Sequence, residues 1–209
     1  NELFWLSLDP TMVYSCAYFT SADDSLEEAQ TRKLDVVCQK LRLEPGERLL
    51  DIGCGWGSMA IHAASNYGVE VVGVTLSIAQ AERARERVAE AGLEDRIEIR
   101  IQDYREVSDG PFDKLCSIGM FEHTGSDIDG YFAETAKLGK PGGLALHHGI
   151  CRQHSDEESP NTFINHYVFP DGELHRVARV IAGLERSGQE LRDVENLREH
   201  YALTLRHWV

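Results

Sequence analysis

Three glycines at alternate positions, in the stretch LDIGCGWG (residues 50–57), are the residues of this sequence best suited to holding a ligand. Asp51 precedes them at the end of an apolar run, and a helix-compatible run (58–67) follows. Glycine lets the backbone turn sharply and lets a ligand lie against bare main chain, beside a helix N-terminus. The stretch predicts a strand-to-helix loop that binds a nucleotide-like cofactor; the alternative is a glycine-rich turn without a ligand.

The spacing of these glycines separates two classes of cofactor. It is D-x-G-x-G-x-G, which differs from the G-x-G-x-x-G of dinucleotide-binding folds and resembles the loop of S-adenosylmethionine-dependent methyltransferases. That resemblance puts Asp51 near the amino-acid end of the cofactor. The second predicted strand (69–74) ends without the acid that holds the ribose in nicotinamide-binding folds, which counts against NAD. Thr75 and Gln80 become candidates for the ribose, although Gln80 also fits a capping box with Ser77.

Polar residues also follow the third and fourth predicted strands. Gln102 and Asp103 follow the third strand, where an acid suits the amino group of adenine, although a solvated loop aspartate is the commoner outcome. Glu122 and His123 follow the fourth strand. Because ligands bind at the carboxyl ends of strands in open α/β sheets, these positions are candidates for the active face.

The fifth predicted strand ends in two adjacent histidines. Strand alternation puts His148 and Ile150 on the face of Leu144 and Leu146, with His147 on the opposite face. A lone strand histidine is usually structural, but a position at the carboxyl end of a parallel strand makes a functional role equally favoured.

The elements that position these residues follow from the periodicity of the chain. Ser25 and Glu28 form a capping box, and apolar residues at helical spacing predict an amphipathic helix over 26–42. Strands and helices alternate after it, which predicts an α/β fold: a mostly parallel sheet with helices on both faces. We expect strands at 48–52, 69–74, 96–101, 113–119, 143–150 and 189–195, and helices at 57–67, 78–91, 126–138, 173–187 and from about 200. Two of these helices should end at Gly92 and at Pro141-Gly142-Gly143.

Composition and charge restrict the classes of function. A formal net charge of −14 argues against a nucleic-acid partner and leaves only local, apolar contact with a membrane. No apolar run approaches the ~20 residues of a membrane span. The five cysteines never form a C-x-x-C pair, which predicts a reducing, cytoplasmic compartment without a zinc or other metal site. No signal peptide is visible, although a first residue other than Met indicates a trimmed chain.

The length of 209 residues fits a single domain. Residues 1–10 are too apolar for a free tail, and packing on the domain is favoured over packing on an acyl substrate. An aromatic segment interrupts the alternation of strands and helices after the fifth strand. We therefore expect one domain over 1–209, with a segment 1–25 and an insertion 151–172 that cover the active site.

Seven stretches together resemble the cyclopropane-fatty-acid synthase family, which includes the mycolic acid methyltransferases. They are YSCAYF (14–19), LLDIGCGWG (49–57), VVGVTLS (71–77), QDYR (102–105), SIGMFEHTG (117–125), FINHYVFPDGEL (163–174) and NLREHYALTLRHW (196–208). The resemblance implies a Rossmann-like class I methyltransferase fold. It covers nearly the whole chain, which makes it more specific than the glycine loop alone.

The resemblance also implies an activity and a catalytic pocket. The family transfers a methyl group from S-adenosylmethionine to a cis double bond of an unsaturated acyl chain of a phospholipid, through a carbocation, to give a cyclopropane or methyl-branched product. A bound bicarbonate ion is the implied base. The pocket maps onto Cys16, Glu122, His148, Ile150 and Tyr201. Because a carboxylate beside an anion repels it unless the carboxylate is protonated or bridged by His148, we expect a raised pKa for Glu122.

The cofactor contacts implied by the resemblance come from the loops after the first three strands and from the N-terminal segment. They are Tyr14, Ser15, Asp51, Gly53, Cys54, Gly55, Thr75, Leu76, Ser77, Gln80, Gln102, Asp103 and Tyr104. The implied partners are an unsaturated acyl lipid and the inner membrane surface in peripheral contact, with the protein a monomer or a homodimer.

The chain departs from the family at three points. Gly149 stands where the family usually has Thr, and His175 where it often has Pro, both on the substrate side. The family also continues well past Trp208, so we expect either a truncated C-terminal part or an unusually short member. Two alternatives stay open: a small-amine N-methyltransferase, and a cofactor-binding but inactive fragment.

Overall fold

A five-stranded parallel sheet forms the centre of the molecule in a computed structural model that describes residues 8–152 and 172–208. The strands lie in the order β3-β2-β1-β4-β5. Their bounds are β1 (Arg48–Ile52), β2 (Glu70–Thr75), β3 (Ile97–Ile101), β4 (Phe112–Ile118) and β5 (Gly139–His148). Because all paired strands are parallel, their carboxyl ends meet at one edge of the sheet, where such folds bind ligands.

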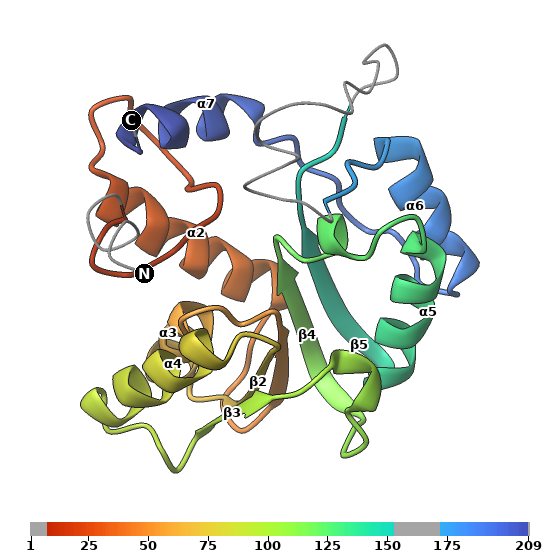
Figure 1. The fold of residues 1–209 in the computed structure, drawn as a ribbon, viewed down its shortest axis with the longest axis horizontal. Helices are drawn as coiled ribbons and strands as arrows, with labels where there is room; N and C mark the ends of the chain where they lie inside the picture. Colours follow the sequence, from red (N-terminus) through yellow and green to blue (C-terminus); the bar gives the residue numbers. More distant parts are fainter. Residues whose placement is uncertain (1–7, 153–171, 209) are drawn as a thin grey trace.

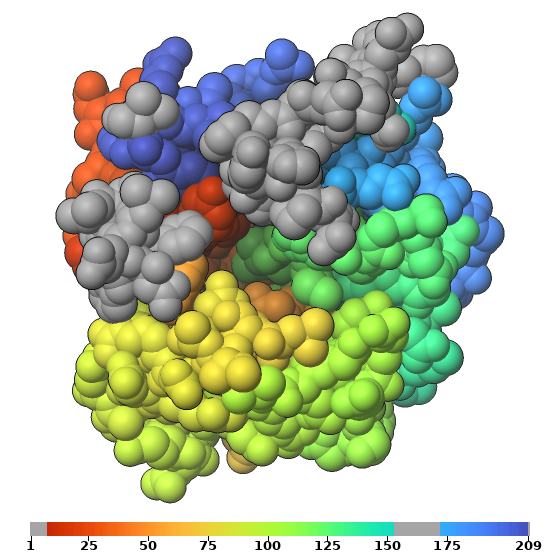
Figure 2. Space-filling model, viewed as in Figure 1, coloured from red at the N-terminus to blue at the C-terminus, as the bar shows by residue number. Residues whose placement is uncertain are grey.

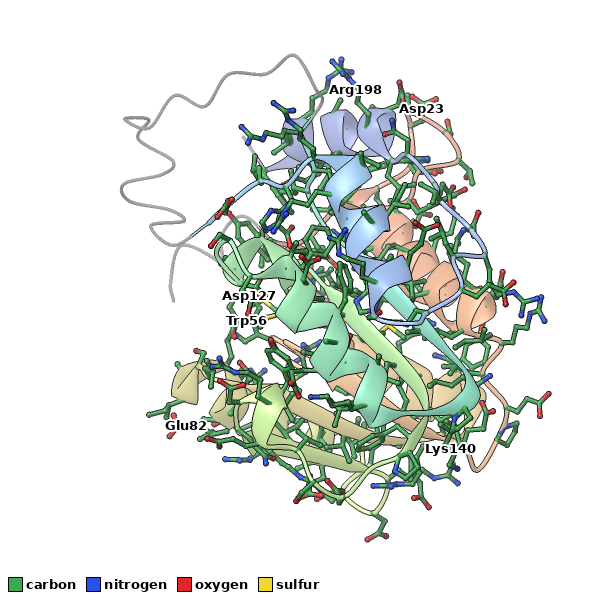
Figure 3. All side chains as sticks on the ribbon, turned by 90° about the vertical axis from the view of Figure 1, so that its right-hand side faces the viewer. Asp23, Trp56, Glu82, Asp127, Lys140 and Arg198 are labelled. Carbon is green, nitrogen blue, oxygen red and sulfur yellow. The ribbon has the colours of Figure 1, made fainter. Side chains whose placement is uncertain are left out.

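Helices cover both faces of the sheet, as the sequence predicts (Figure 1). One face carries α2 (Leu26–Leu41), α3 (Ser58–Tyr67) and α4 (Ile78–Glu90). The other carries α5 (Ile128–Leu138), with α6 (Val177–Arg186) packed on it; Figure 3 looks onto this side, with Asp127 at the start of α5 and Lys140 near the start of β5. Two short turns follow strands, η1 (Tyr104–Glu106) and η2 (Phe121–His123), and α7 (Arg198–His207) lies beside the N-terminal residues.

Strand alternation supplies both apolar layers. Leu49 and Val71 pack with α2, α3 and α4, whereas their neighbours Leu50 and Val72 pack with Phe112 and the end of α5 on the other face. A strand with apolar residues at every position is buried on both sides, so the core fixes the register of the sheet. No helix in the described part of the chain is long and apolar enough to cross a membrane.

The predicted elements between residues 26 and 138 are confirmed to within two residues at each end. The predicted helix end at Pro141-Gly142-Gly143 is wrong, because α5 ends at Leu138 and the strand β5 already begins at Gly139. These residues lie inside β5, where the register against β4 shifts between Phe112 and Lys114. The strand also ends earlier than predicted, at His148.

The predicted strand over 189–195 is wrong as well. This segment forms neither strand nor helix, and its apolar side chains, Leu191 and Val194, remain 37% and 59% exposed. Its acids, Asp193 and Glu195, pair with Lys40 of α2 instead.

The helix predicted over 173–187 starts later, at Val177. Before it, the Glu173 backbone donates to the Glu122 carbonyl and the His175 ring bonds to the Gly125 carbonyl. The predicted insertion 151–172 falls almost entirely outside the described residues.

Helix α2 is amphipathic, but its buried stripe includes two polar residues. Ser25 and Glu28 form the predicted capping box, with the Ser25 hydroxyl accepting from the Glu28 backbone. The buried positions repeat at helical spacing: Leu26, Ala29, Gln30, Lys33, Leu34, Val37, Cys38 and Leu41. Gln30 and Lys33 are 0% and 3% exposed, so both must find partners inside the protein.

These partners belong to the N-terminal strap, the name we give to residues 9–19. Gln30 donates to the carbonyls of Val13 and Ser15, and Lys33 donates to the Ser15 hydroxyl. From the other side, α7 supplies Thr204, whose hydroxyl accepts from the Ala17 backbone at 3.0 Å. The strap is thus held between α2 and α7, two helices far apart in sequence (Figure 1).

We expect Thr204→Val to lower the free energy of unfolding by about 1–3 kcal/mol, because it leaves the buried Ala17 N–H without an acceptor. Thr204 is fully buried, and valine has nearly the same shape. Thr204→Ser keeps the oxygen and should cost only about 1 kcal/mol for the lost methyl group. Urea unfolding measures both variants, and equal stability of the valine and serine variants would contradict the proposed docking of the strap.

Candidate active site

The glycine loop between β1 and α3 has the geometry that its composition predicts. Gly53, Gly55 and Gly57 all have positive φ angles, between 55° and 78°, which residues with a side chain rarely adopt. A Cβ atom at Gly57 would lie 3.2 Å from the Cβ of Ala84, so this glycine also allows α4 to approach the loop. The backbone N–H groups of Gly53 and Cys54 both donate to the Val74 carbonyl, which fixes the loop to the end of β2.

Asp51 lies at the base of this loop with an incomplete set of partners. It is 2% exposed, and one carboxylate oxygen accepts from the Cys116 thiol at 3.4 Å. The other oxygen, Oδ2, is buried without a partner. Burial raises the pKa of Asp51 to about 6, and the thiol and the Lys33 charge oppose this only in part. A buried, unpaired carboxylate oxygen is costly, so it indicates a missing donor such as the amino group of a ligand.

The end of β2 presents Thr75 toward the start of α4. The Thr75 hydroxyl donates to the side-chain carbonyl of Gln80 at 3.2 Å, and the Ser77 hydroxyl caps α4 by accepting from the Gln80 backbone. Only half of the predicted capping box forms, because the Gln80 side chain turns to Thr75. Leu76 is 67% exposed, as expected for an apolar residue that covers a ligand.

The residues after β3 are held by their own neighbours. Gln102 donates through its backbone to the Thr75 carbonyl and through its side chain to the Glu106 carbonyl. Asp103 pairs with the Arg105 guanidinium, which lowers the pKa of Asp103. Tyr104 packs edge-on against Tyr131 at 5.6 Å between ring centres. The structure therefore gives Asp103 a local partner, in line with the loop alternative for this residue.

The N-terminal strap brings Tyr14, Ser15 and Cys16 to the same edge of the sheet. The Tyr14 ring lies 4.9 Å from that of Trp208, and the Ser15 hydroxyl accepts from Lys33 at 2.9 Å. Cys16 is 6% exposed, and burial raises the pKa of its thiol to about 11. Cys16 is therefore an uncharged thiol at neutral pH.

Glu122 and Ile150 are brought together by a direct hydrogen bond. The Ile150 backbone N–H donates to Glu122 Oε1 at 2.7 Å, while Oε2 is buried without a partner. Burial raises the pKa of Glu122, which agrees with the sequence-based expectation for its direction. A Cβ atom at Gly149 would lie 2.8 Å from Oε2 and 2.3 Å from the Phe121 ring, so this departure from the family is what the local packing requires.

The two adjacent histidines point to opposite faces, as strand alternation predicts. His147 bonds to the Tyr131 hydroxyl at 3.0 Å and packs against Phe132 on the α5 side. His148 faces the α2 side, where the charge of Lys33 adds to the effect of burial. Burial lowers the pKa of each histidine to about 4, so both are neutral at pH 7. The Nδ1 atom of His148 has no protein partner.

Tyr201 on α7 completes the cluster. Burial raises the pKa of its hydroxyl to about 12, and Tyr14, Cys16 and Glu122 add smaller contributions, so each of these three side chains lies within electrostatic range of Tyr201. Figure 2 shows the surface hollowed on this side of the molecule, where the red residues of the strap meet yellow and green residues of the sheet's ligand-binding edge. The site thus combines a glycine loop, an apolar cover and several uncharged polar side chains.

These features fit a cofactor with an amino-acid end and an adenosine. The bare glycines offer main chain, Asp51 Oδ2 lacks a donor, and Leu76 is exposed beside the loop. A search of the described residues finds no group of three His, Cys, Asp or Glu side chains that could hold a metal ion.

Sequence reasoning missed three residues that position the site. Lys33 and Gln30 hold the strap, and Arg87 donates to the carbonyls of Trp56 in the glycine loop and Thr11 in the strap. A signal for two of them was present, because Gln30 and Lys33 share the helical stripe of Leu26, Ala29 and Leu34. Polar residues inside a buried stripe indicate a required partner.

An open groove of about 770 Å³ lies elsewhere, between α2 and α3. It contains Asp35, which accepts from the Tyr67 hydroxyl at 2.6 Å and lies 3.7 Å from His62. Its acids are exposed or paired, and it contains none of the predicted site residues. We therefore assign the chemistry to the carboxyl edge of the sheet.

Known proteins are similar to this chain over nearly its whole length. A family model for mycolic acid cyclopropane synthetase matches residues 1–209. A probable fatty acid methyltransferase of Pseudomonas putida is 45% identical over 214 residues, which cover 100% of this chain and 54% of the relative. The cyclopropane-fatty-acyl-phospholipid synthase of Escherichia coli (strain K12) is 46% identical over 209 residues, covering 100% and 53%. The chain spans about half the length of these curated relatives.

A solved structure is similar over nearly the whole chain. It is a mycolic acid cyclopropane synthase complexed with SAH and CTAB, with a TM-score of 0.90 and 36% sequence identity. The match covers 99% of this chain and 77% of the synthase. The likeness supports the class I methyltransferase fold assigned from the sheet.

We expect the stability of the protein to fall as the pH rises from about 4 to about 6 because of Asp51. Its folded-state pKa is raised to about 6, so stability that is present below the unfolded pKa is lost as the carboxyl ionises, by about 3 kcal/mol at most. Urea unfolding across this range should show the loss in the wild type and not in Asp51→Asn. Asp23→Asn, on an exposed turn, should follow the wild type; an equal pH dependence in Asp51→Asn would contradict the assignment.

Proposed function

The chain belongs to the mycolic acid cyclopropane synthetase family, and we propose that it is an S-adenosylmethionine-dependent methyltransferase that acts on the double bond of an unsaturated acyl chain of a phospholipid. The observation that carries the proposal is the uncharged state of the polar side chains around the site. Cys16 and Tyr201 are neutral at pH 7, and burial moves their pKa values further from it, while burial lowers the pKa of His148 to about 4 and makes it neutral too. Relatives named as fatty acid methyltransferase and cyclopropane-fatty-acyl-phospholipid synthase support the substrate class.

An alkene acceptor suits such a pocket. When bound, S-adenosylmethionine supplies an electrophilic methyl group. An alkene has no proton to lose before it is methylated, so the first step needs no thiolate and no strong base, and a thiol with a pKa of about 11 offers neither. The carbocation formed on the acyl chain must be kept from water, which a buried, apolar site achieves.

The second step removes a proton from the substrate, and the chain's own groups are poorly suited to it. His148 has a pKa near 4 and is a weak base, and Glu122 is already bonded to the Ile150 backbone. The Tyr201 hydroxyl and His148 would hold a bicarbonate ion, which when bound would supply the base for this proton. In the described structure the Ile150 N–H serves Glu122, so the ion would meet Ile150 through other atoms or displace the carboxylate.

Exposed apolar residues at the strand ends support an acyl substrate taken from a lipid surface. Leu76, Ile78 and Ile101 are 67%, 61% and 46% exposed, and each lies at or just after the carboxyl end of β2 or β3. The synthase complexed with CTAB holds a molecule with a long alkyl chain. With a net charge of −14, contact with a membrane would rest on these apolar residues.

Incubation of the intact protein with methyl-labelled S-adenosylmethionine and vesicles of an unsaturated phospholipid should move label into the acyl chains. Vesicles of the saturated analogue should stay unlabelled, because they lack the nucleophilic double bond. Mass spectrometry of the acyl chains identifies a ring or a methyl branch. Absence of label from every unsaturated lipid tested, with label appearing in a small amine, would replace this function by N-methylation.

Tyr201→Phe should lower kcat by about 10²- to 10³-fold, as expected for a lost donor to a reacting anion. It should also raise the bicarbonate concentration needed for half-maximal rate. Tyr67→Phe, which removes a hydroxyl from the distant groove, is the matched control and should leave both values unchanged. A Tyr201→Phe enzyme with normal turnover and normal bicarbonate dependence would remove Tyr201 from the mechanism.

A further inference from the structure

Lys33 is a buried cation in the middle of the site that the proposed reaction does not use. It lies on the sheet-facing stripe of α2 and is 3% exposed. Its ammonium donates to the Ser15 hydroxyl at 2.9 Å. A lysine buried this deeply costs free energy unless it meets hydrogen-bond partners and negative charge, so its place in the fold requires an explanation.

The bond to Ser15 determines where the Ser15 proton points. A hydroxyl that accepts a hydrogen bond from an ammonium must direct its own O–H elsewhere, and the neighbouring charge makes it a stronger donor. Gln30 holds the Ser15 carbonyl at 2.8 Å, so α2 fixes this residue on two sides. Ser15 thus becomes an oriented donor at the ligand-binding edge, suited to an anionic group such as a carboxylate.

Asp51 presents the opposite charge close by. Its Oδ2 atom is buried without a partner, and Lys33 and Asp51 influence each other's pKa. Lys33 nevertheless donates to Ser15, which leaves the Asp51 oxygen available to a ligand. A cation with its hydroxyl relay and an unsatisfied carboxylate, within electrostatic range of each other, match a ligand that carries both charges.

We propose that Lys33 helps to recognise the amino-acid end of the cofactor by orienting the Ser15 hydroxyl toward the ligand carboxylate. Asp51, which the resemblance already places at this end, would then face the ammonium, so that Lys33 and Asp51 act as a charge pair. Lys33 is in this sense a positioning residue. The inference rests on the proposed function only for the identity of the cofactor, and it makes no reference to the methyl acceptor.

The ionisation of Lys33 supports a pH-dependent affinity. Burial lowers the pKa of Lys33 to about 8, and four acidic groups around it raise the pKa in part. The groups that face it are Asp9 and Cys16 of the strap, Asp51 of β1, His62 of α3, Cys116 of β4 and His148 of β5. Lys33 is charged at pH 7 and loses its proton above pH 8, so affinity for a ligand carboxylate should weaken there.

Calorimetry with three ligands isolates the contribution of the charge pair. The ligands are S-adenosylhomocysteine, its decarboxylated analogue and 5′-methylthioadenosine, which lacks the amino-acid end altogether. Lys33→Met should weaken binding of S-adenosylhomocysteine by about ten- to hundredfold, the range for a lost hydrogen bond to a charged group. It should leave binding of the other two ligands within about twofold. Lys137→Met, which removes an exposed lysine from α5, is the control and should bind all three as the wild type does.

Ser15→Ala tests the same relay with the buried charge still in place, and it serves if Lys33→Met fails to fold. It should weaken binding of S-adenosylhomocysteine selectively, because it removes the hydroxyl through which Lys33 acts. In the wild type this affinity should fall above pH 8 more steeply than in Lys33→Met. Equal weakening for all three ligands in both variants would overturn the proposal and make Lys33 structural. Selective weakening without methyl transfer to any lipid would uphold the charge pair and refute the proposed substrate.

Discussion

The attachment of the N-terminal strap to α2 is the interaction on which the site depends. Gln30 and Lys33 are polar residues in a buried helical stripe, and each donates its hydrogen bonds to the strap. The strap carries Tyr14, Ser15 and Cys16 to the glycine loop and also provides the surface on which α7, with Tyr201, docks. A fold that satisfies its own buried polar groups in this way assembles both halves of the site at once.

The residue types in the sequence were sufficient to predict the parts of the site that depend on backbone conformation. Gly53, Gly55 and Gly57 need positive φ, and that requirement is readable from residue type alone. The role of Lys33 cannot be predicted in the same way, because it depends on residues 17 or more positions away. The wrong strand at 189–195 has a related cause: alternation over seven residues carries no information about whether a sheet edge is available to pair.

The electrostatics of the site follow from burial more than from specific charge pairs. Desolvation is the largest influence on the pKa of Cys16, Asp51, Glu122, His148 and Tyr201, and in each case it favours the neutral form. The raised pKa of Cys16 keeps its sulfur a thiol, which is a weaker nucleophile toward an electrophilic carbocation than a thiolate. Lys33, by contrast, is a buried cation that attracts an anionic group of a ligand.

The docking of α7 on the strap has a consequence for biosynthesis. The hydrogen bonds from Ala17 to Thr204 and from Phe19 to His200 join residues 187 and 181 positions apart. Closing so long a loop has a high entropic cost, and during synthesis the first partner leaves the ribosome well before the second is made. The sheet and its glycine loop are therefore complete before α7 is made, and the catalytic cluster is completed last. A nascent chain stalled before α7 would have the glycine loop for the methyl donor but would lack Tyr201 of the catalytic cluster.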